Sequence, residues 1–188
     1  MRYEKGRKDA TRRNIIAVAA RRFREDGIAA TGLAGVMSEA GLTNGAFYPH
    51  FSSKGDLVAA CVTASMEEQG EVIQQALDAG GLDRMIAAYL SAEHRDDPGH
   101  GCPSAALLPE IARQPGELHE RYTERLMVLV KEIAAALPPG TENRPGVAFG
   151  VLATLIGSLQ LARAVEGADL SDSILDAGAT AARQLVAG

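Results

Sequence analysis

Long stretches of this chain carry no turn signal, and their apolar residues are mainly Ala, Leu, Val and Ile. Apolar residues make up 46% of the 188 residues but aromatic residues only 4%, so aliphatic side chains must fill the core. Long, unbroken stretches of this composition favour α-helices over strands. A chain of this length buries enough surface for one or two small domains. The sequence therefore predicts an all-α protein.

Glycine and proline clusters divide the chain into about nine predicted helices, three in the first 54 residues and six after them. The predicted helices span residues 9–26, 31–40, 43–48, 53–79, 82–93, 104–113, 115–137, 145–166 and 171–186. We expect Thr31 and Thr43 to cap the second and third helices, and Pro115 to open the seventh. The stretch HRDDPGHGCPS, residues 94–104, is predicted as a loop.

The charge of the chain is unevenly distributed. Residues 1–54 hold ten Lys and Arg against five Asp and Glu, a net charge of +5, whereas the remainder holds nine against nineteen, a net charge of −10. A basic segment joined to an acidic body indicates contact with a polyanion, unless the basic residues only cluster on a solvated surface. The arginines expected on the surface of the first helix are Arg12, Arg13, Arg21, Arg22 and Arg24.

Three of the eight Phe and Tyr residues lie between Phe47 and Phe51, beside a proline, His50 and, shortly after, Lys54. They follow a predicted arrangement of short helix, glycine turn and short helix. This order is typical of a helix-turn-helix, whose second helix enters the DNA major groove. We expect Phe47 and Phe51 to form the centre of a small three-helix domain.

The segment TGLAGVMSEAGLTNGAFYPHFSSKGDL, residues 31–57, resembles the DNA-binding segment of the TetR family of bacterial transcriptional regulators. The matching residues are Thr31, Ala40-Gly41, Gly45, Phe47-Tyr48, His50-Phe51 and Lys54. The departures from the family pattern are Gly32, Gly35 and Met37, and the two glycines loosen the second helix. The resemblance implies a three-helix DNA-binding domain at residues 1–54, followed by a six-helix domain at residues 55–188 that binds an effector and dimerises.

Several residues of the matching segment have expected roles on DNA. Tyr48 is expected to donate a hydrogen bond from its hydroxyl to a DNA phosphate while its ring packs on the protein. His50 and Lys54 are expected to reach the same strand of the DNA backbone. Asn44 is placed to pair with adenine, although it is equally suited to cap the helix. The predicted DNA-binding residues are Thr31, Gly32, Thr43, Asn44, Gly45, Tyr48, His50 and Lys54.

The resemblance also implies a homodimer built from the last two helices of each chain, which suits a pseudo-palindromic double-stranded DNA operator. Small residues offer a face for close contact, and apolar residues beside them add area, although packing within one chain needs the same composition. The predicted interface residues are Gly150, Ala153, Gly157 and Ala164, with Val151, Leu155, Leu159 and Val165 adding area.

The family also implies a pocket for a small-molecule effector whose identity the sequence does not reveal. Flexible and aromatic apolar side chains are candidates, and plain core residues are the alternative. The predicted pocket residues are Met66, Tyr89, Leu90, Cys102, Leu107, Leu108 and Met127.

The two cysteines, Cys61 and Cys102, fit no disulfide framework, which favours a reducing cytoplasmic location. Cys102 is open to three interpretations: a redox sensor, a metal ligand with His94, Asp97 and His100, or a buried structural residue. The metal spacing matches no familiar site, so we predict no metal. No secretory leader is expected, and residues 147–165, which include Arg163, are expected to be a buried helix rather than a membrane span.

The sequence holds no nucleophile elbow, phosphate-binding loop, zinc-protease motif or dinucleotide fingerprint, so we expect neither an enzyme nor a cofactor. The function predicted from the resemblance is a ligand-responsive DNA-binding transcriptional repressor that an effector releases from its operator. The alternative is a helical interaction or ligand-binding protein without sequence-specific DNA binding.

Overall fold

The structure is a computed structural model that describes residues 2–114 and 116–188. Within these ranges the chain forms eight α-helices, two short 3-10 helices and no strand, which confirms the all-α prediction. The elements are α1 (Arg2–Asp26), α2 (Leu33–Glu39), η1 (Asn44–Ala46), α3 (Lys54–Tyr89), α4 (Ala92–Asp96), η2 (Pro98–His100), α5 (Pro103–Ile111), α6 (Gly116–Ala136), α7 (Arg144–Ala164) and α8 (Ala168–Ala187).

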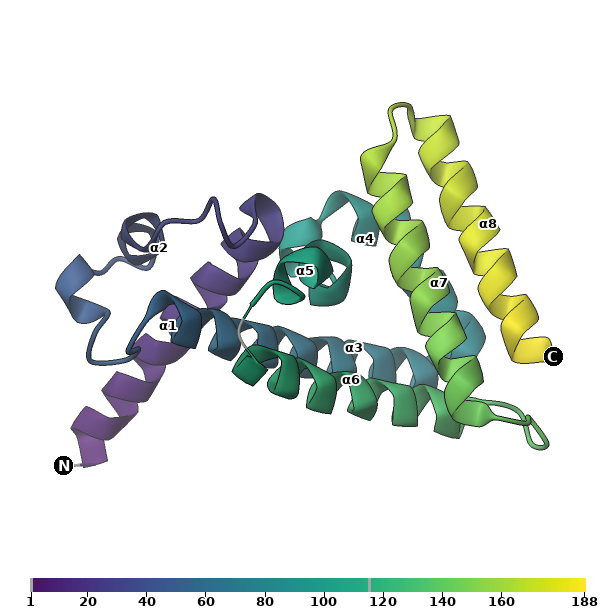
Figure 1. Ribbon diagram of the computed structural model, residues 1–188, viewed down its shortest axis with the longest axis horizontal. Coiled ribbons are helices and arrows are strands. Elements are labelled where there is room, and N and C mark those ends of the chain that lie inside the picture. The colour runs from purple at the N-terminus through teal and green to yellow at the C-terminus, as the bar shows by residue number, and fades with distance from the viewer. Residues whose placement is uncertain (1, 115) are drawn as a thin grey trace.

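The helices form a small head and a larger body (Figure 1). In the body, α3 and α6 lie side by side, α7 packs against α6, and α8 runs back along α7. At the other end, α1 contacts α3, α5 and η2, and carries α2 and η1 on its far side. One continuous set of buried apolar side chains joins the two parts, so the predicted division at residue 54 stays a prediction.

The long helix α3 changes direction at Gly80 and Gly81, where the sequence predicts one helix to end and another to begin. Gly80 is extended (φ −177°), and Gly81 has φ +67° and ψ −158°, a conformation that essentially only glycine adopts. The helix therefore has two arms, residues 54–79 and 82–89. Its start is as expected: Ser53 caps it by accepting a hydrogen bond from the Asp56 amide at 3.1 Å.

Three helix predictions and one loop prediction are wrong in detail. The helix predicted at residues 82–93 is interrupted, because α3 ends at Tyr89 and α4 begins at Ala92. The first helix begins at Arg2 rather than at residue 9. The third predicted helix, residues 43–48, is a single 3-10 turn, because Pro49 and the buried Phe47 and Phe51 close the chain before a second turn forms. The predicted loop at residues 94–104 contains the end of α4 and all of η2.

The predicted helix caps also differ from the structure. Gly32, not Thr31, occupies the N-cap of α2, because the Thr31 side chain is only 1% exposed and donates to the Gly27 carbonyl at 2.7 Å. Thr43 occupies the N-cap of η1, but its side chain makes no capping hydrogen bond. The predicted opening of a helix at Pro115 lies outside the described residues.

Helix α7 is the one described helix that is long and apolar enough to cross a membrane by length and composition alone, with 33% of its apolar window buried in the chain. The core helix of a soluble protein meets the same criterion. Val151, Leu155 and Leu159 are completely buried in the chain's own core. Their predicted contribution to an interface between copies is therefore wrong, because α5, α6 and α8 already cover them.

Candidate functional site

The head, which we define as residues 31–51, is built around aromatic side chains. The rings of Phe47 and Phe51 stack with centroids 5.5 Å apart, and both are buried as predicted. The guanidinium carbon of Arg12 lies 4.8 Å from the Phe51 ring centre, an arrangement in which cation and ring attract. This core fixes which residues of the head face outward.

The outward residues of the head include Thr43, Asn44 and Gly45 of the 3-10 turn, all exposed. Tyr48 is 74% exposed, and its ring lies edge to face with the Phe47 ring, the two centroids 5.5 Å apart. The Tyr48 ring packs on the protein as expected only where it meets Phe47, and most of the residue is exposed, because Phe47 and Phe51 already fill the centre of the head. The Tyr48 ring and hydroxyl instead project together from the head.

His50 is half-buried, and no described group hydrogen-bonds to its buried Nδ1 atom. Burial lowers the pKa of His50, and the cations Lys8 and Arg12 lower it further. The imidazole is therefore predominantly neutral at neutral pH. A phosphate contact at this position would therefore rest on a neutral N–H group.

The Lys54 side chain forms a hydrogen bond within the protein. Its Nζ atom donates to the Ile28 carbonyl at 2.6 Å, so this cation holds the turn between α1 and α2. The Glu110 carboxylate of α5 binds the same turn, accepting hydrogen bonds from the amides of Ile28 at 3.1 Å and Ala29 at 3.0 Å. Position within a motif showed that Lys54 lies near the head, but not that the turn uses its charge.

Arg24 was expected on the surface and is only 8% exposed. Its Nε atom donates to the Gly99 carbonyl at 2.6 Å, and its Nη1 atom donates to the Ser65 hydroxyl. Burial lowers the pKa of Arg24. We call Arg24, Ser65, Gly99 and Glu110 the joint, since they connect α1 and its turn to α3, η2 and α5. The sequence held a signal for it: Arg24 lies four residues after the buried Ala20, at the edge of the same helix face.

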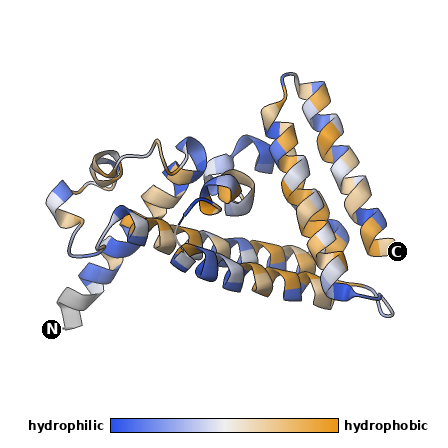
Figure 2. Ribbon diagram, in the orientation of Figure 1, coloured by the Kyte–Doolittle hydropathy of each residue, from blue (hydrophilic) through white to orange (hydrophobic). Residues whose placement is uncertain are grey.

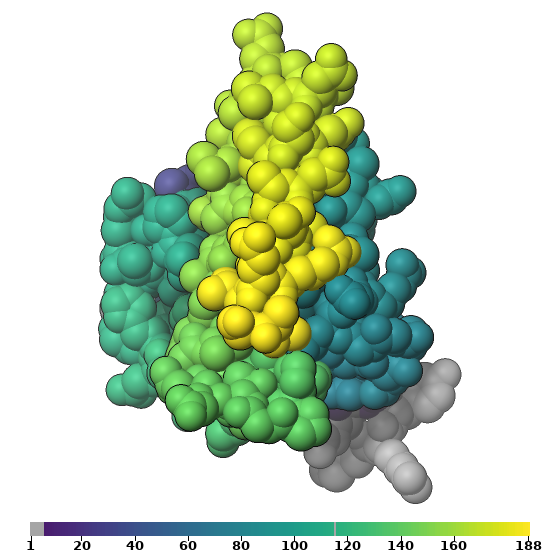
Figure 3. Space-filling model, turned by 90° about the vertical axis from the view of Figure 1, so that its right-hand side faces the viewer, coloured from purple at the N-terminus to yellow at the C-terminus, as the bar shows by residue number. Residues whose placement is uncertain are grey.

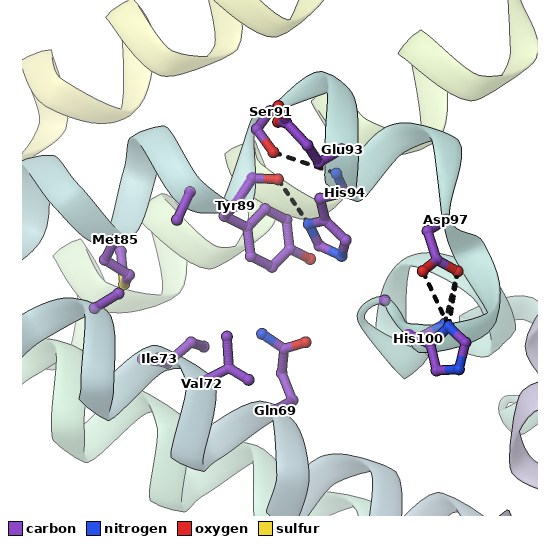
Figure 4. Close-up of a pocket in the computed structure, with 13 residues that line it drawn as sticks. Gln69, Val72, Ile73, Met85, Tyr89, Ser91, Glu93, His94, Asp97 and His100 are labelled. Atoms are coloured by element: carbon purple, nitrogen blue, oxygen red, sulfur yellow. Dashed lines mark hydrogen bonds and ion pairs between the residues drawn. The ribbon is translucent and has the colours of Figure 1, made fainter.

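A pocket of about 290 Å³ lies between the two arms of α3 and the segment that follows them. The residues that line it are Gln69, Val72, Ile73, Ala76, Met85, Ala88, Tyr89, Ser91, Glu93, His94, Asp97, His100 and Gly101 (Figure 4). Tyr89 is the one predicted pocket residue among them. Met66, Leu90, Cys102 and Leu107 are buried, Leu108 is half-buried and Met127 is partly exposed on α6.

Two rings in edge-to-face contact form one wall of the pocket. Tyr89 and His94 meet edge to face at 4.7 Å. His94 Nδ1 donates to the Tyr89 carbonyl at 2.7 Å, and Nε2 accepts from the Cys102 amide at 2.9 Å. This pairing requires the neutral ring, and burial lowers the pKa of His94 accordingly. Both ring nitrogens are thus engaged within the chain, which contradicts the interpretation of His94 as a metal ligand.

The Tyr89 hydroxyl is buried and has no hydrogen-bond partner of good geometry among the described residues. Burial raises the pKa of Tyr89 well above its usual value, and the neighbouring Cys102 thiol adds to this effect. An unpaired buried hydroxyl costs about 1–3 kcal/mol, so the wall carries a polar group that the chain itself leaves unsatisfied. Cys102 is a buried free thiol.

Helices α7 and α8 are rich in apolar residues (Figure 2), and α8 lies on the face of the molecule turned to the viewer in Figure 3. Phe149, Leu161, Leu170 and Leu185 are all exposed, Leu161 by 60%. Of the predicted interface residues, Ala153 and Ala164 are exposed, a Cβ atom added at Gly157 would meet nothing within 4 Å, and one added at Gly150 would lie in ordinary contact with Leu185 of the same chain, at 3.5 Å.

Comparison with known proteins matches residues 15–61 to the family described as "Bacterial regulatory proteins, tetR family". The regulator AcrR of Shigella flexneri is 39% identical over 62 residues, which is 33% of this chain and 29% of AcrR. The probable regulator ArpR of Pseudomonas putida is 37% identical over 73 residues, 39% of this chain and 35% of ArpR. The matched segment thus spans about a third of the length of these relatives.

The fold has counterparts over its whole length. A transcriptional regulator of the TetR family from Cytophaga hutchinsonii superposes with a TM-score of 0.79 at 23% identity, covering 97% of this chain and 96% of that one. This agreement extends through α8 and establishes the fold of the body as well as that of the head.

Proposed function

Since the chain belongs to the TetR family of bacterial regulatory proteins, we propose that it is a DNA-binding transcriptional regulator. The observation that carries the proposal is the exposed 3-10 turn with Tyr48 beside it, inside the segment that matches the family. Thr43, Asn44 and Gly45 are presented to base edges, and the Tyr48 hydroxyl to a phosphate. The basic charge of residues 1–54 attracts the duplex.

The finer proposal is a repressor that binds a pseudo-palindromic operator as a homodimer. The exposed apolar residues of α7 and α8 support a second copy of the chain as the partner that covers this face. A stable dimer buries about 800 Å² on each partner, so it needs an extended surface of this kind. Two copies related by a twofold axis would present two heads to successive turns of the major groove, roughly 34–36 Å apart.

The joint supports a route by which an effector releases DNA. Gly99 belongs to η2, beside the pocket lining residues His100 and Gly101, and its carbonyl binds Arg24 of α1. A ligand that displaces this wall moves the helix that carries the head. Such coupling between two sites is typically worth about 1–3 kcal/mol, enough to lower operator affinity severalfold to a hundredfold.

The test is selection of bound sequences from a randomised DNA pool, followed by titration of the selected site at about 50 and 200 mM salt. We expect a pseudo-palindrome whose affinity falls with salt with a slope of about −0.9 per phosphate contact. Tyr48→Phe should weaken binding to all sequences, whereas Asn44→Ala should relax preference at one base pair. Ser173→Ala, which removes a hydroxyl from α8, is the control and should do neither.

Sedimentation at several protein concentrations tests the dimer. Leu161→Glu on α7 should give monomers, whereas Val128→Glu, at another exposed apolar site on α6, should not. Recovery of no preferred DNA sequence, with weak binding that moderate salt abolishes, would favour an interaction or ligand-binding protein instead.

A further inference from the structure

The pocket between the arms of α3 changes character along its length (Figure 4). One end is apolar and is formed by Val72, Ile73, Ala76, Met85 and Ala88. The opposite end carries polar and charged side chains from both arms and from the segment that follows the second arm. A ligand that matches this pocket has an apolar body and one polar head group.

At the polar end, two side chains lack partners within the pocket lining. The Tyr89 ring is 4% exposed and its hydroxyl is unpaired, while the buried Gln69 amide faces it across the pocket with no hydrogen bond to another residue drawn in Figure 4. Both side chains carry an oxygen that can accept a hydrogen bond. Each side chain can also donate, Tyr89 through its O–H and Gln69 through its amide NH₂, so the two groups can complete either a donor or an acceptor, and the surrounding charge decides between them.

The charge at this end is negative. Glu93 and Asp97 line the pocket, and hydrogen bonds lower the pKa of both carboxyl groups: Glu93 through its own backbone amide and Ser91, Asp97 through His100. The His100 ring lies 3.0 Å from the Asp97 carboxylate, so this acid is partly engaged. Glu93 forms no ion pair with the described cations. The polar end thus favours a cation over an anion.

No Lys or Arg belongs to the described lining to oppose this charge. Arg163 lies behind the wall, where it donates to the carbonyls of Arg95 at 3.0 Å and of His94. His94 adds no charge, because its ring is neutral. A carboxylate or phosphate head group would therefore enter a site with two acids and no cation to receive it.

We propose that this pocket binds a small hydrophobic amine, with its apolar body between the two arms of α3 and its ammonium group among Gln69, Tyr89, Glu93 and Asp97. The cavity, about 290 Å³, is at the lower end of the range for small-molecule sites, so the ligand is of single-ring size. Amine binding itself needs no DNA, and the role of the amine as an effector rests on the proposed function.

Three probes with the same phenylbutyl body test the class of ligand: phenylbutylamine, phenylbutanol and phenylpentanoate. Their affinities for the full chain are measured by titration calorimetry without DNA. We expect the amine to bind most tightly, the alcohol severalfold more weakly, and the carboxylate at least about tenfold more weakly than the amine. Equal affinities for amine and carboxylate, or binding of none of the three, would overturn the proposal.

A charge-matched pair of double variants locates the site. Glu93→Gln with Asp97→Asn should bring the amine to the affinity of the alcohol. Glu120→Gln with Glu124→Gln, which removes the same charge from the exposed side of α6, should leave the preference for the amine intact. Equal losses in both pairs would assign the preference to the overall field and overturn the site. Circular dichroism establishes that each variant is folded.

The two proposals can fail independently, because calorimetry tests the pocket and DNA selection tests the regulator. If the chain binds the amine but selects no DNA sequence, the pocket proposal stands and the proposal of a DNA-binding regulator is overturned. A selected operator with no amine binding keeps the regulator and overturns the pocket proposal. When both succeed, the amine should lower operator affinity, and the Glu93 and Asp97 double variant should lose this response.

Discussion

The head and the pocket each contain one buried polar atom that no described residue satisfies, His50 Nδ1 and the Tyr89 hydroxyl, yet they are built in opposite ways. In the head, an aromatic core directs Tyr48 and Asn44 outward, so its polar groups are ready for a partner's surface. In the pocket, Tyr89 and Gln69 turn inward and face each other. The head is suited to a large polar partner, and the pocket to a ligand small enough to enter.

The joint between these two regions differs from both, because its buried polar groups are paired. Arg24 donates to Gly99 and Ser65, and Glu110 receives the amides of the α1–α2 turn. Satisfied buried networks are rigid and transmit displacement, whereas unsatisfied groups are completed only by a ligand. The following changes break or sharpen this difference, beginning with the joint.

Arg24→Met should cause the largest loss. It keeps an apolar stem of similar length but leaves the Gly99 carbonyl and the Ser65 hydroxyl without their donor. We expect the free energy of unfolding, measured by urea denaturation, to fall by roughly 2–3 kcal/mol. Arg13→Met, at an exposed site on the same helix, should change it by less than about 0.5 kcal/mol. Equal effects would show that Arg24 is not a structural connection.

The same contrast explains what the sequence could predict. The roles of Phe47 and Phe51 follow from spacing within a few residues, because neighbouring elements form the head. The pocket joins Gln69 to Tyr89 and Asp97 across the bend in α3. The glycines at 80 and 81 predicted that the helix breaks, but not the angle between its arms. Sequence reasoning therefore chose Met66 and Leu107, which the fold turns into the core.

Lys54 and Arg24 show a second limit. Both are cations in a basic segment, and charge alone suggests that both face DNA. In the structure each side chain donates a hydrogen bond to a backbone carbonyl: Lys54 to that of Ile28, and Arg24 to that of Gly99. Which carbonyl needs a donor depends on how turns and helices from distant parts of the chain meet, and single-sequence patterns do not contain this information.

Gly81→Ala tests the bend that creates the pocket. A Cβ atom would meet nothing within 4 Å, so the cost comes from the backbone conformation at φ +67° and ψ −158°. We expect a loss of about 1–2 kcal/mol in unfolding free energy. Gly70→Ala lies within the first arm in ordinary contact with Leu129 and should instead stabilise the chain by about 0.5–1 kcal/mol. Stabilisation by both would mean that the bend does not need glycine.

Tyr89→Phe and Tyr122→Phe remove the same atom from an unsatisfied and a satisfied site. The Tyr122 hydroxyl bonds to Ser104 at 2.9 Å, so its removal should lower the unfolding free energy by about 1 kcal/mol. Removal of the unpaired Tyr89 hydroxyl should leave stability unchanged or raise it by up to about 1 kcal/mol, while weakening phenylbutylamine binding. Thermal melts with and without amine measure both. A loss of stability as large as that of Tyr122→Phe would mean that the Tyr89 hydroxyl is already paired.

The smallest effect is expected from pH, and it compares the two histidines. Burial lowers the pKa of both His94 and His50 in the folded chain. As the pH falls, the unfolded chain therefore binds more protons than the folded chain does. Stability should therefore fall as the pH drops below the unfolded value of about 6.5, by at most about 1.4 kcal/mol per pH unit for each group. His94→Gln should remove more of this slope than His50→Gln, because protonating His94 also breaks its bond from the Cys102 amide, whereas the His50 ring is partly open to solvent. Urea midpoints between about pH 7.5 and 5.5 decide it. An equal slope in the two variants would mean that the folded chain disfavours protonation of His94 no more than that of His50. It would then weaken the argument that the pocket wall holds His94 in its neutral form.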